Sequence, residues 1–134
     1  YDSSLLLMQF YGFIDAGDER YVKTVKAIKE NLLYNGLMYR YKTEDDFGVP
    51  SSSFTVCNFW MIQALYVIGE KEEARQMFES IVTYANHVGL YSEDFDFETK
   101  RLLGNFPQAY SHLAFINAAT LFSEEQFLSK FIRP

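Results

Sequence analysis

The sequence predicts an all-α fold of three helical hairpins in which inner and outer helices alternate. Its 134 residues are enough for one domain with a packed core. No stretch has the period-2 alternation of a β-strand, whereas helical periodicity covers most of the chain. Segments that are apolar on nearly every side alternate with segments that carry one apolar stripe. An amphipathic helix, a Gly-Leu pair, a long loop and an apolar helix also recur after about fifty residues.

The segments that are apolar on nearly every side are expected to form the inner helices, because such a helix must be covered on both sides. Their expected ranges are about 3–13, 53–68 and 107–122. Asp2 or Ser3 is expected to cap the first. Trp60, in the middle of the second, is interpreted as a core residue. Pro107 is expected in the first turn of the third, where its missing N–H costs nothing.

The segments with one apolar stripe are expected to form outer helices with a solvated back. Their expected ranges are about 18–33, 71–86 and 123–132. In the first, Val22, Val25, Ile28 and Leu32 recur at helical spacing. The last is expected to be a separate short helix with Ser123 as its cap. These outer helices would alternate with the inner ones as nested hairpins do.

Charge and hydropathy argue against two classes of partner. The net charge is −6 and the basic residues are scattered among acidic ones, which argues against nucleic acid because phosphate binding needs clustered Lys and Arg. No apolar run approaches the roughly 20 residues that cross a bilayer, so no membrane partner is expected.

The histidines and the cysteine indicate no cofactor. His87 and His112 have no Cys, Asp or Glu at metal-ligand spacing, so neither a metal nor another cofactor is expected. The single cysteine, Cys57, cannot form an internal disulfide and is interpreted as a buried small apolar residue. It slightly favours a cytoplasmic location, although the sequence does not define one.

The loop Gly-Leu-Tyr-Ser-Glu-Asp-Phe-Asp at 89–96 is the strongest candidate for chemistry. It places Glu93 in a glycine-bounded loop that leads to an inner helix, where a carboxylate is suited to general acid–base work. The alternative is a solvated loop glutamate. Aligning Gly36 with Gly89 places Arg40 opposite Glu93, each in a loop that enters an inner helix. Both side chains are therefore expected on the same rim.

Several motifs occur in order along the chain: DSSLLL at 2–7, YRY at 39–41, DDFG at 45–48, CNFW at 57–60, GLYSED at 89–94 and GNFPQAYSH at 104–112. Together they resemble the C-terminal half of the catalytic domain of glycoside hydrolase family 15, which includes glucoamylases, related α-glucosidases and bacterial trehalases. The resemblance implies about half of an (α/α)6 toroid. Residues 1–134 would form one partial domain that packs against the N-terminal half.

The resemblance also implies hydrolysis of an α-linked glucoside with inversion, by two carboxylates about 6.5–9.5 Å apart. Glu93 matches the general base, and Asp94 is the next candidate. No motif here matches the general acid, which would lie upstream, so the isolated chain is expected to be inactive. A glucoamylase-like, exo-acting parent enzyme is expected first, and a trehalase is the alternative within this class.

The resemblance makes Arg40 a donor to sugar hydroxyls, a role that suits its planar guanidinium. The alternative is a surface arginine paired with an acidic residue at 44–46. Further substrate-binding candidates are the aromatic and imidazole side chains of Phe54, Tyr91, Tyr110 and His112. Packing is the alternative for the aromatic residues, and His112 could instead orient the loop of Glu93.

A second function class remains open from the residues alone. Helical repeats in a non-enzymatic interaction module produce the same alternation and the same kind of period. Such a module, however, needs polar terminal helices, whereas the first segment here is apolar on every side. It also has no need for the elaborate loop around Glu93.

Overall fold

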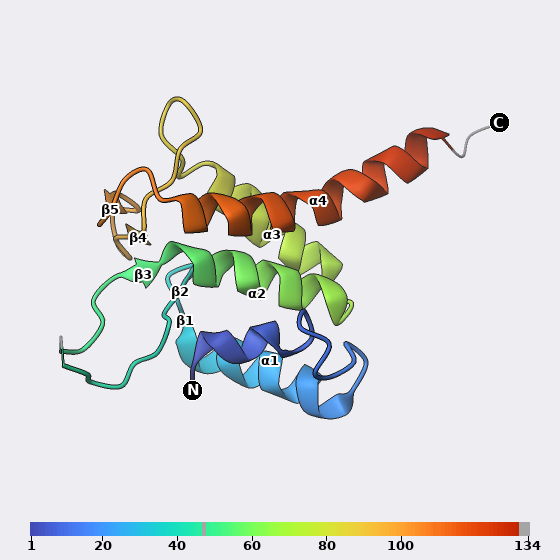
Figure 1. The fold of residues 1–134 in the computed structure, drawn as a ribbon, viewed down its shortest axis with the longest axis horizontal. Coiled ribbons are helices and arrows are strands. Elements are labelled where there is room, and N and C mark those ends of the chain that lie inside the picture. The colour runs from blue at the N-terminus through green and yellow to red at the C-terminus, as the bar shows by residue number, and fades with distance from the viewer. Residues whose placement is uncertain (47, 132–134) are drawn as a thin grey trace.

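The computed structural model describes residues 1–46 and 48–131. The fold is predominantly helical, with two small antiparallel sheets at one end (Figure 1). The helices are a 3-10 helix, η1, and four α-helices: η1 Ser3–Met8, α1 Glu19–Leu32, α2 Thr55–Val67, α3 Lys71–Val82 and α4 Ala109–Phe131. None of the helices in this described part is long and apolar enough to cross a membrane.

Helix α2 is the centre of the fold, as its composition predicts. It packs against η1 and α1 on one side and against α3 and α4 on the other (Figure 1). Its residues are buried almost continuously from Thr55 to Leu65. Trp60 and Cys57 lie in this core, which confirms both interpretations. Burial raises the pKa of the Cys57 thiol, so it stays neutral.

Helix α1 begins and ends within a residue of its expected bounds. Asp18 caps it by accepting a hydrogen bond from the backbone N–H of Arg20 at 2.8 Å. Val25, Ile28 and Leu32 face the core and the opposite side is solvated. Helix α3 begins at Lys71 as expected but ends at Val82, four residues earlier than predicted.

The first expected helix, about 3–13, is only the 3-10 helix η1. Asp2 caps it, with Oδ1 accepting from the N–H of Ser4 at 2.7 Å. The chain then turns through Gly12, whose φ of 71° is in the left-handed region that favours glycine. The aromatic residues that follow η1 are consequently exposed rather than wrapped inside a helix: Phe10, Tyr11 and Phe13.

The predicted break at Ser123 is wrong. Helix α4 runs without interruption from Ala109 to Phe131, and the Ser123 hydroxyl donates to the Thr120 carbonyl instead of capping a new helix. The predicted end of the separate helix, residue 132, lies outside the described residues. Pro107 is also not in the first turn: it follows a cis peptide bond, two residues before the helix starts.

The prediction that the chain contains no strands is also wrong. Short strands form two antiparallel sheets. In the first, β1 Leu33–Tyr34 pairs with β2 Leu37–Met38. In the second, β4 Asp94–Phe95 lies between β3 Ser53–Phe54 and β5 Leu102–Leu103 and pairs with both. The β1–β2 turn has positive φ at both Asn35 and Gly36, 47° and 76°. An Asn-Gly pair is a strong hairpin signal. It was visible in the sequence, but two-residue strands are too short to show alternation.

A buried amide joins the first hairpin to the start of α2. Asn58 Oδ1 accepts from the N–H of Met38 at 2.8 Å, and its Nδ2 donates to Ser53 Oγ at 2.9 Å. Ser53 Oγ in turn donates to the Met38 carbonyl at 2.8 Å. All three residues are fully buried. This network holds β2 against β3. It thereby fixes the position of Met38, two residues before Arg40.

Candidate active site at the strand end

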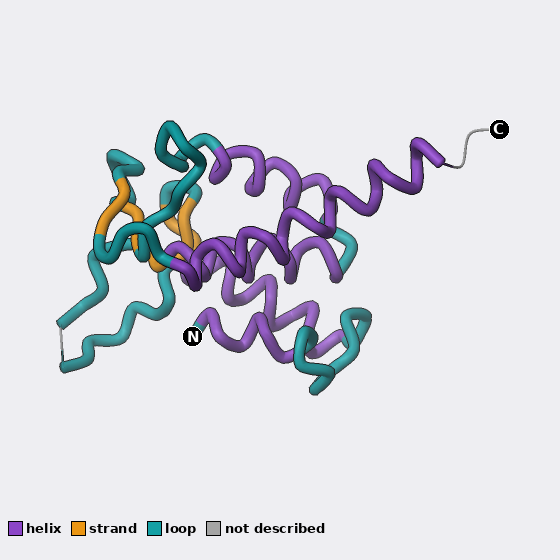
Figure 2. Tube along the Cα trace, turned by 45° about the horizontal axis from the view of Figure 1, so that its top comes forward, coloured by secondary structure: helices purple, strands orange, loops and turns teal. Residues whose placement is uncertain are grey.

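An open cleft of about 760 Å³ lies at the end of the molecule that carries the strands. The long loop between β2 and β3 projects from this end (Figure 2). Its residues make up most of the cleft lining. Arg40 and Glu93 both line the cleft, as the glycine alignment predicts. Its lining residues are Arg40, Tyr41, Asp45, the segment 48–52, Phe54, Glu93 and Asp94.

Glu93 is held by the first residue of α2 and by the segment that follows β5. Its carbonyl accepts from the N–H of Thr55 at 2.8 Å, and its own N–H donates to the Asn105 carbonyl at 2.9 Å. One carboxylate oxygen, Oε2, accepts from the N–H of Asn105 at 3.2 Å and from its Nδ2 at 2.9 Å. The side chain is half-buried at the cleft wall.

Gly104 allows this close approach. Its φ is 73°, and a Cβ there would lie 2.9 Å from Glu93 Oε2 and 3.2 Å from Glu93 Cβ. Among the glycines of the chain, Gly104 is the one whose added Cβ would meet another residue within 4 Å. The space beside the carboxylate is therefore reserved for a residue without a side chain.

Asp94, the second candidate for the base, has a different environment. Ser52 donates to its Oδ2 at 2.6 Å. Burial raises the pKa of Asp94, and the negative charge of Glu93 adds to this, while the hydrogen bond from Ser52 opposes it. Asp94 also pairs with Phe54 and Leu103 through the sheet. Its carboxylate is thus held by Ser52 and its backbone by the sheet, whereas the carboxylate of Glu93 is held by Asn105.

Arg40 forms an ion pair with Asp2, a partner that the sequence analysis did not consider. Its Nε donates to Asp2 Oδ1 at 2.8 Å, and its guanidinium lies 5.9 Å from the ring centroid of Trp60. Burial opposes the charge of Arg40, but the hydrogen bond to Asp2, the charge of Asp2 and smaller contributions from Cys57 and Tyr41 together outweigh it and raise the arginine pKa above its usual value. Burial also opposes the charge of Asp2, but the hydrogen bonds from Arg40 and Ser4, together with the charge of Arg40, outweigh it and lower that carboxyl's pKa.

Tyr91 and His112 do not line the cleft, contrary to the expectation that they contact substrate. Tyr91 is 1% exposed and packs against Phe59, Phe95 and Phe115. His112 Nε2 accepts from the N–H of Tyr91 at 3.2 Å, while Nδ1 donates to a backbone carbonyl at 2.7 Å. Both ring nitrogens are therefore used within the protein, and Nε2 holds the loop of Glu93, which was the alternative for His112.

Helix α4 thus supports the loop from behind. In addition to the bond from Tyr91 to His112, Ser111 donates to the Ser92 carbonyl at 2.8 Å. Ser92 and Ser111 are both fully buried. The two residues that precede Glu93 are consequently tied to the first turns of one helix, which restricts their movement.

Phe54 and Tyr110 are accessible aromatic side chains near the cleft. Phe54 lines it and is half-buried. Tyr110 is exposed and makes edge contacts with Phe54 and Trp60, at centroid distances of 6.3 Å and 6.2 Å. Tyr110 also lines a neighbouring groove with Phe10 and Leu113. Both residues can offer an aromatic surface to a ligand, and both also pack.

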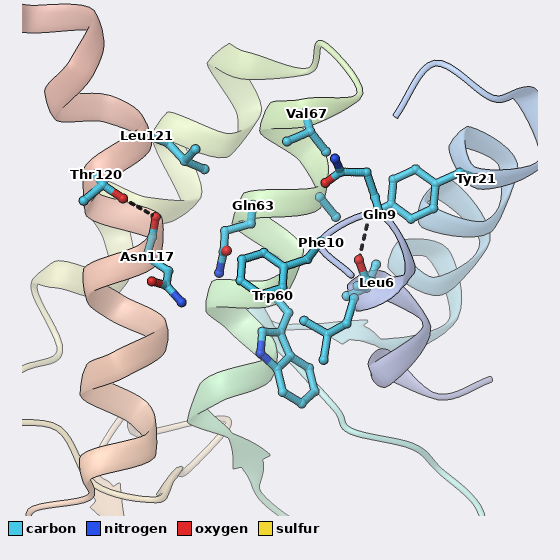
Figure 3. A pocket seen from close by; sticks show the side chains of 12 residues that line it. Leu6, Gln9, Phe10, Tyr21, Trp60, Gln63, Val67, Asn117, Thr120 and Leu121 are labelled. Carbon is cyan, nitrogen blue, oxygen red and sulfur yellow. Dashed lines mark hydrogen bonds between the residues drawn. The ribbon is translucent and has the colours of Figure 1, made fainter. Parts of the chain in front are cut away.

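A second cavity of about 260 Å³ lies between η1, α2 and α4 (Figure 3). Its labelled side chains are mostly apolar or neutral amides, and the Tyr21 hydroxyl in its wall donates to the Leu6 carbonyl at 2.7 Å. Among the residues whose side chains the structure describes, none that lines it is a carboxylate or a histidine. General acid–base chemistry is therefore available in the cleft of Glu93 and not here.

The residues 1–46 and 48–131 contain no group of three or more His, Cys, Asp or Glu side chains that could hold a metal ion. His87 is no part of such a group. The chemistry that the cleft offers is that of a carboxylate with one restrained oxygen and a guanidinium in the lining of the same cleft.

Residues that sequence reasoning missed are those that orient the predicted ones. Asp2 pairs with Arg40 over 38 residues of sequence, Ser52 with Asp94 over 42, and Asn105 with Glu93 over 12. The Gly-Asn pair in the motif at 104–112 was a usable signal, since a glycine before a polar residue is typical of a tight backbone approach. No comparable signal pointed to Asp2 or Ser52.

Comparison with protein families gives a match to the family described as "Glycosyl hydrolases family 15" over residues 1–120. A trehalase of Thermoplasma acidophilum is 43% identical over 130 residues, which are 96% of this chain and 22% of the relative. Trehalases of Mycolicibacterium smegmatis and Mycobacterium tuberculosis are 42% and 41% identical over 120 residues, 87% of this chain and 18% of each relative. The chain spans about a fifth of these curated relatives. No solved structure matches it significantly.

Proposed function

Because this chain belongs to family 15 of the glycosyl hydrolases, we propose that it supplies the general base and part of the substrate site of an enzyme that hydrolyses trehalose. The observation that carries this proposal is the carboxylate of Glu93 at the wall of an open cleft, with one oxygen tied to Asn105. The relatives named above are trehalases. Trehalose therefore replaces the glucoamylase-type substrate that the sequence placed first.

The proposed reaction is an inverting hydrolysis. Glu93 takes a proton from a water molecule, and the water oxygen forms a bond to the anomeric carbon of the glucose. The glycosidic bond breaks, and the leaving oxygen takes a proton from a second, protonated carboxyl group. That general acid is expected in another part of the parent protein. The isolated chain should therefore not turn over substrate.

Within the proposed site, Arg40 donates hydrogen bonds to sugar hydroxyls. Its hydrogen bond to Asp2 uses Nε, and Arg40 lines the cleft, so its terminal nitrogens are the donors proposed for the sugar. Phe54 and Tyr110 offer aromatic surface to an apolar sugar face. Tyr91 and His112 act indirectly, by holding the loop.

We further propose that the chain is one part of an (α/α)6 domain and packs against additional polypeptide. Its support is an exposed apolar surface that a soluble domain does not leave open. This surface includes Phe10, Tyr11 and Phe13 after η1, and Leu113 and Ile116 on α4, which are 60% and 54% exposed. The alternative of a free-standing helical-repeat module has no such requirement, and the family match over residues 1–120 argues against it.

The test is the variant Glu93→Gln in the full-length parent protein, with trehalose as substrate. We expect kcat to fall by about 10²–10⁴-fold with little change in KM, because an amide cannot accept the proton. Glu98→Gln is the matched control. Glu98 is an exposed glutamate on a neighbouring turn that accepts from Tyr34 and Asn35 and does not line the cleft.

Retention of near-normal kcat by Glu93→Gln, with Glu98→Gln unchanged, would refute the assignment of the base. In that case Asp94→Asn would be measured next. If the unmodified enzyme does not hydrolyse trehalose but does hydrolyse maltooligosaccharides, the assignment of trehalose as the substrate is refuted.

A further inference from the structure

We propose that Asn105 is a positioning residue for Glu93, which holds Oε2 of the carboxylate and leaves Oε1 as the oxygen that accepts the proton from water. This inference rests on the proposed function of Glu93 and names a residue that determines how the base is presented. Asn105 does not itself contact the reacting atoms.

The two residues make three hydrogen bonds with each other. The Glu93 N–H donates to the Asn105 carbonyl at 2.9 Å. The Asn105 N–H and its side-chain Nδ2 both donate to Glu93 Oε2, at 3.2 Å and 2.9 Å. Asn105 thus binds both the backbone and the side chain of Glu93. The carboxylate cannot rotate without losing two hydrogen-bond donors.

The sheet fixes the distance between the two residues. Glu93 directly precedes β4 and Asn105 follows β5 by two residues. These strands pair with Asp94 opposite Leu103 and Phe95 opposite Leu102. The register of a paired hairpin determines which residues meet at its open end. Asn105 therefore reaches Glu93 because of the fold and not because of a chance rotamer.

The arrangement makes the two carboxylate oxygens unequal. Oε2 has two donors and faces Gly104, where even a methyl group would approach to 2.9 Å. Oε1 has no hydrogen-bond partner among the residues that the structure describes. Since Glu93 lines the cleft, Oε1 is the atom available to a water molecule there.

Several elements contribute charged and titratable groups near Glu93. These groups are the same in the unmodified enzyme and in the Asn105 variants that are compared below. Asp94 is next to it in β4, and His112 supports the loop from α4. Arg40, Tyr41 and Asp45 line the same cleft, and Asp2 pairs with the first of these. A change in pH dependence caused by altering Asn105 alone can therefore be assigned to its contact with Glu93.

The experiment is the pH profile of kcat/KM for trehalose in the full-length enzyme and its variants Asn105→Asp and Asn105→Ala. In Asn105→Asp a second carboxylate lies beside Oε2 and disfavours the ionised base. We expect the acid limb of the profile to move to higher pH by about one unit. In Asn105→Ala the side-chain donor is lost while the backbone donor stays, so the shift is in the same direction but smaller. KM should change by less than about twofold.

Asn35→Asp is the matched control. The Asn35 amide also donates to a glutamate, Glu98 Oε2 at 3.3 Å, at a turn outside the cleft. This variant adds the same charge at the same type of contact, so its acid limb should coincide with that of the unmodified enzyme. Thermal unfolding of each variant verifies that it is folded, and Asn105→Asp changes almost no volume.

An acid limb that does not move in either Asn105 variant would overturn the inference. So would an equal shift in Asn35→Asp, since the effect would then be one of net charge. The two proposals fail separately. If Glu93→Gln is inactive but the Asn105 variants keep the original acid limb, only the positioning role is refuted. If Glu93→Gln retains kcat, the base assignment itself is refuted.

Discussion

Substitution of Gly104 by alanine should damage the active site more than it damages the fold. The φ of 73° is unfavourable for an L-residue by about 1 kcal/mol. The added methyl group would also lie 2.9 Å from Glu93 Oε2, whereas ordinary contact begins at 3.4 Å. The carboxylate must therefore move by roughly 0.5 Å, the difference between these distances, and its bonds to Asn105 must lengthen or break.

The expected loss of kcat on trehalose is about tenfold and at most about a hundredfold, because a displacement of about 1 Å at a catalytic group can cost about 10²-fold and this displacement is smaller. The unfolding free energy should fall by about 1–2 kcal/mol. Steady-state kinetics and urea denaturation of the full-length enzyme measure the two quantities. Gly36→Ala is the matched control, since Gly36 has a φ of 76° and nothing within 4 Å of an added Cβ.

The two variants have the same backbone strain and differ in the clash with Glu93. Gly36→Ala should therefore lose a similar unfolding free energy and retain its kcat. Normal kcat in a folded Gly104→Ala enzyme would show that the position of Glu93 is not limiting, and would refute the reasoning. An equal loss of kcat in both variants would assign the effect to strain alone.

Two further predictions concern the fold around the site. Asn58→Ala should lower the unfolding free energy by about 2–3 kcal/mol, measured by urea denaturation, because it leaves the buried N–H of Met38 without an acceptor; a change below about 0.5 kcal/mol would contradict this. Asp2→Asn should cost at most about 1 kcal/mol at neutral pH, since the Arg40 and Asp2 side chains are 35% and 38% exposed. The bond lowers the Asp2 pKa, so its contribution is present above the usual aspartate pKa and is lost as pH falls through the lowered value. The difference between the two proteins in a pH series of unfolding measurements should therefore vanish at acid pH, and a constant difference would exclude the ionised pair as its cause.

Helical periodicity predicted α1 and α2 well, because each has long, uniform patterns and clear boundaries. Asp18 caps α1 as a polar residue before an apolar stripe should. The same reasoning failed at Ser123, where a plausible cap sequence lies inside a continuous helix. Cap residues are compatible with helix ends but do not require them, since a serine in a helix interior can bond to a carbonyl one turn back.

The glycine alignment predicted that Arg40 and Glu93 lie on the same rim, and both line one cleft. It could not predict which cleft candidates point elsewhere. Tyr91 and His112 are close to Glu93 in sequence or motif, but one is buried and the other is bonded through both ring nitrogens. Proximity along the chain does not define direction, because a short turn can send adjacent side chains to opposite sides.

The amino-acid sequence by itself determined the helical core, the order of its helices, the family, and Glu93 with Arg40 as the candidates for chemistry. These depend on local periodicity and on motifs of adjacent residues, which are readable without coordinates. The tertiary structure alone decided that Asp2 restrains Arg40, Ser52 holds Asp94 and Asn105 orients Glu93. Such contacts join distant segments through strand register and loop closure, and therefore arise only when the chain is folded.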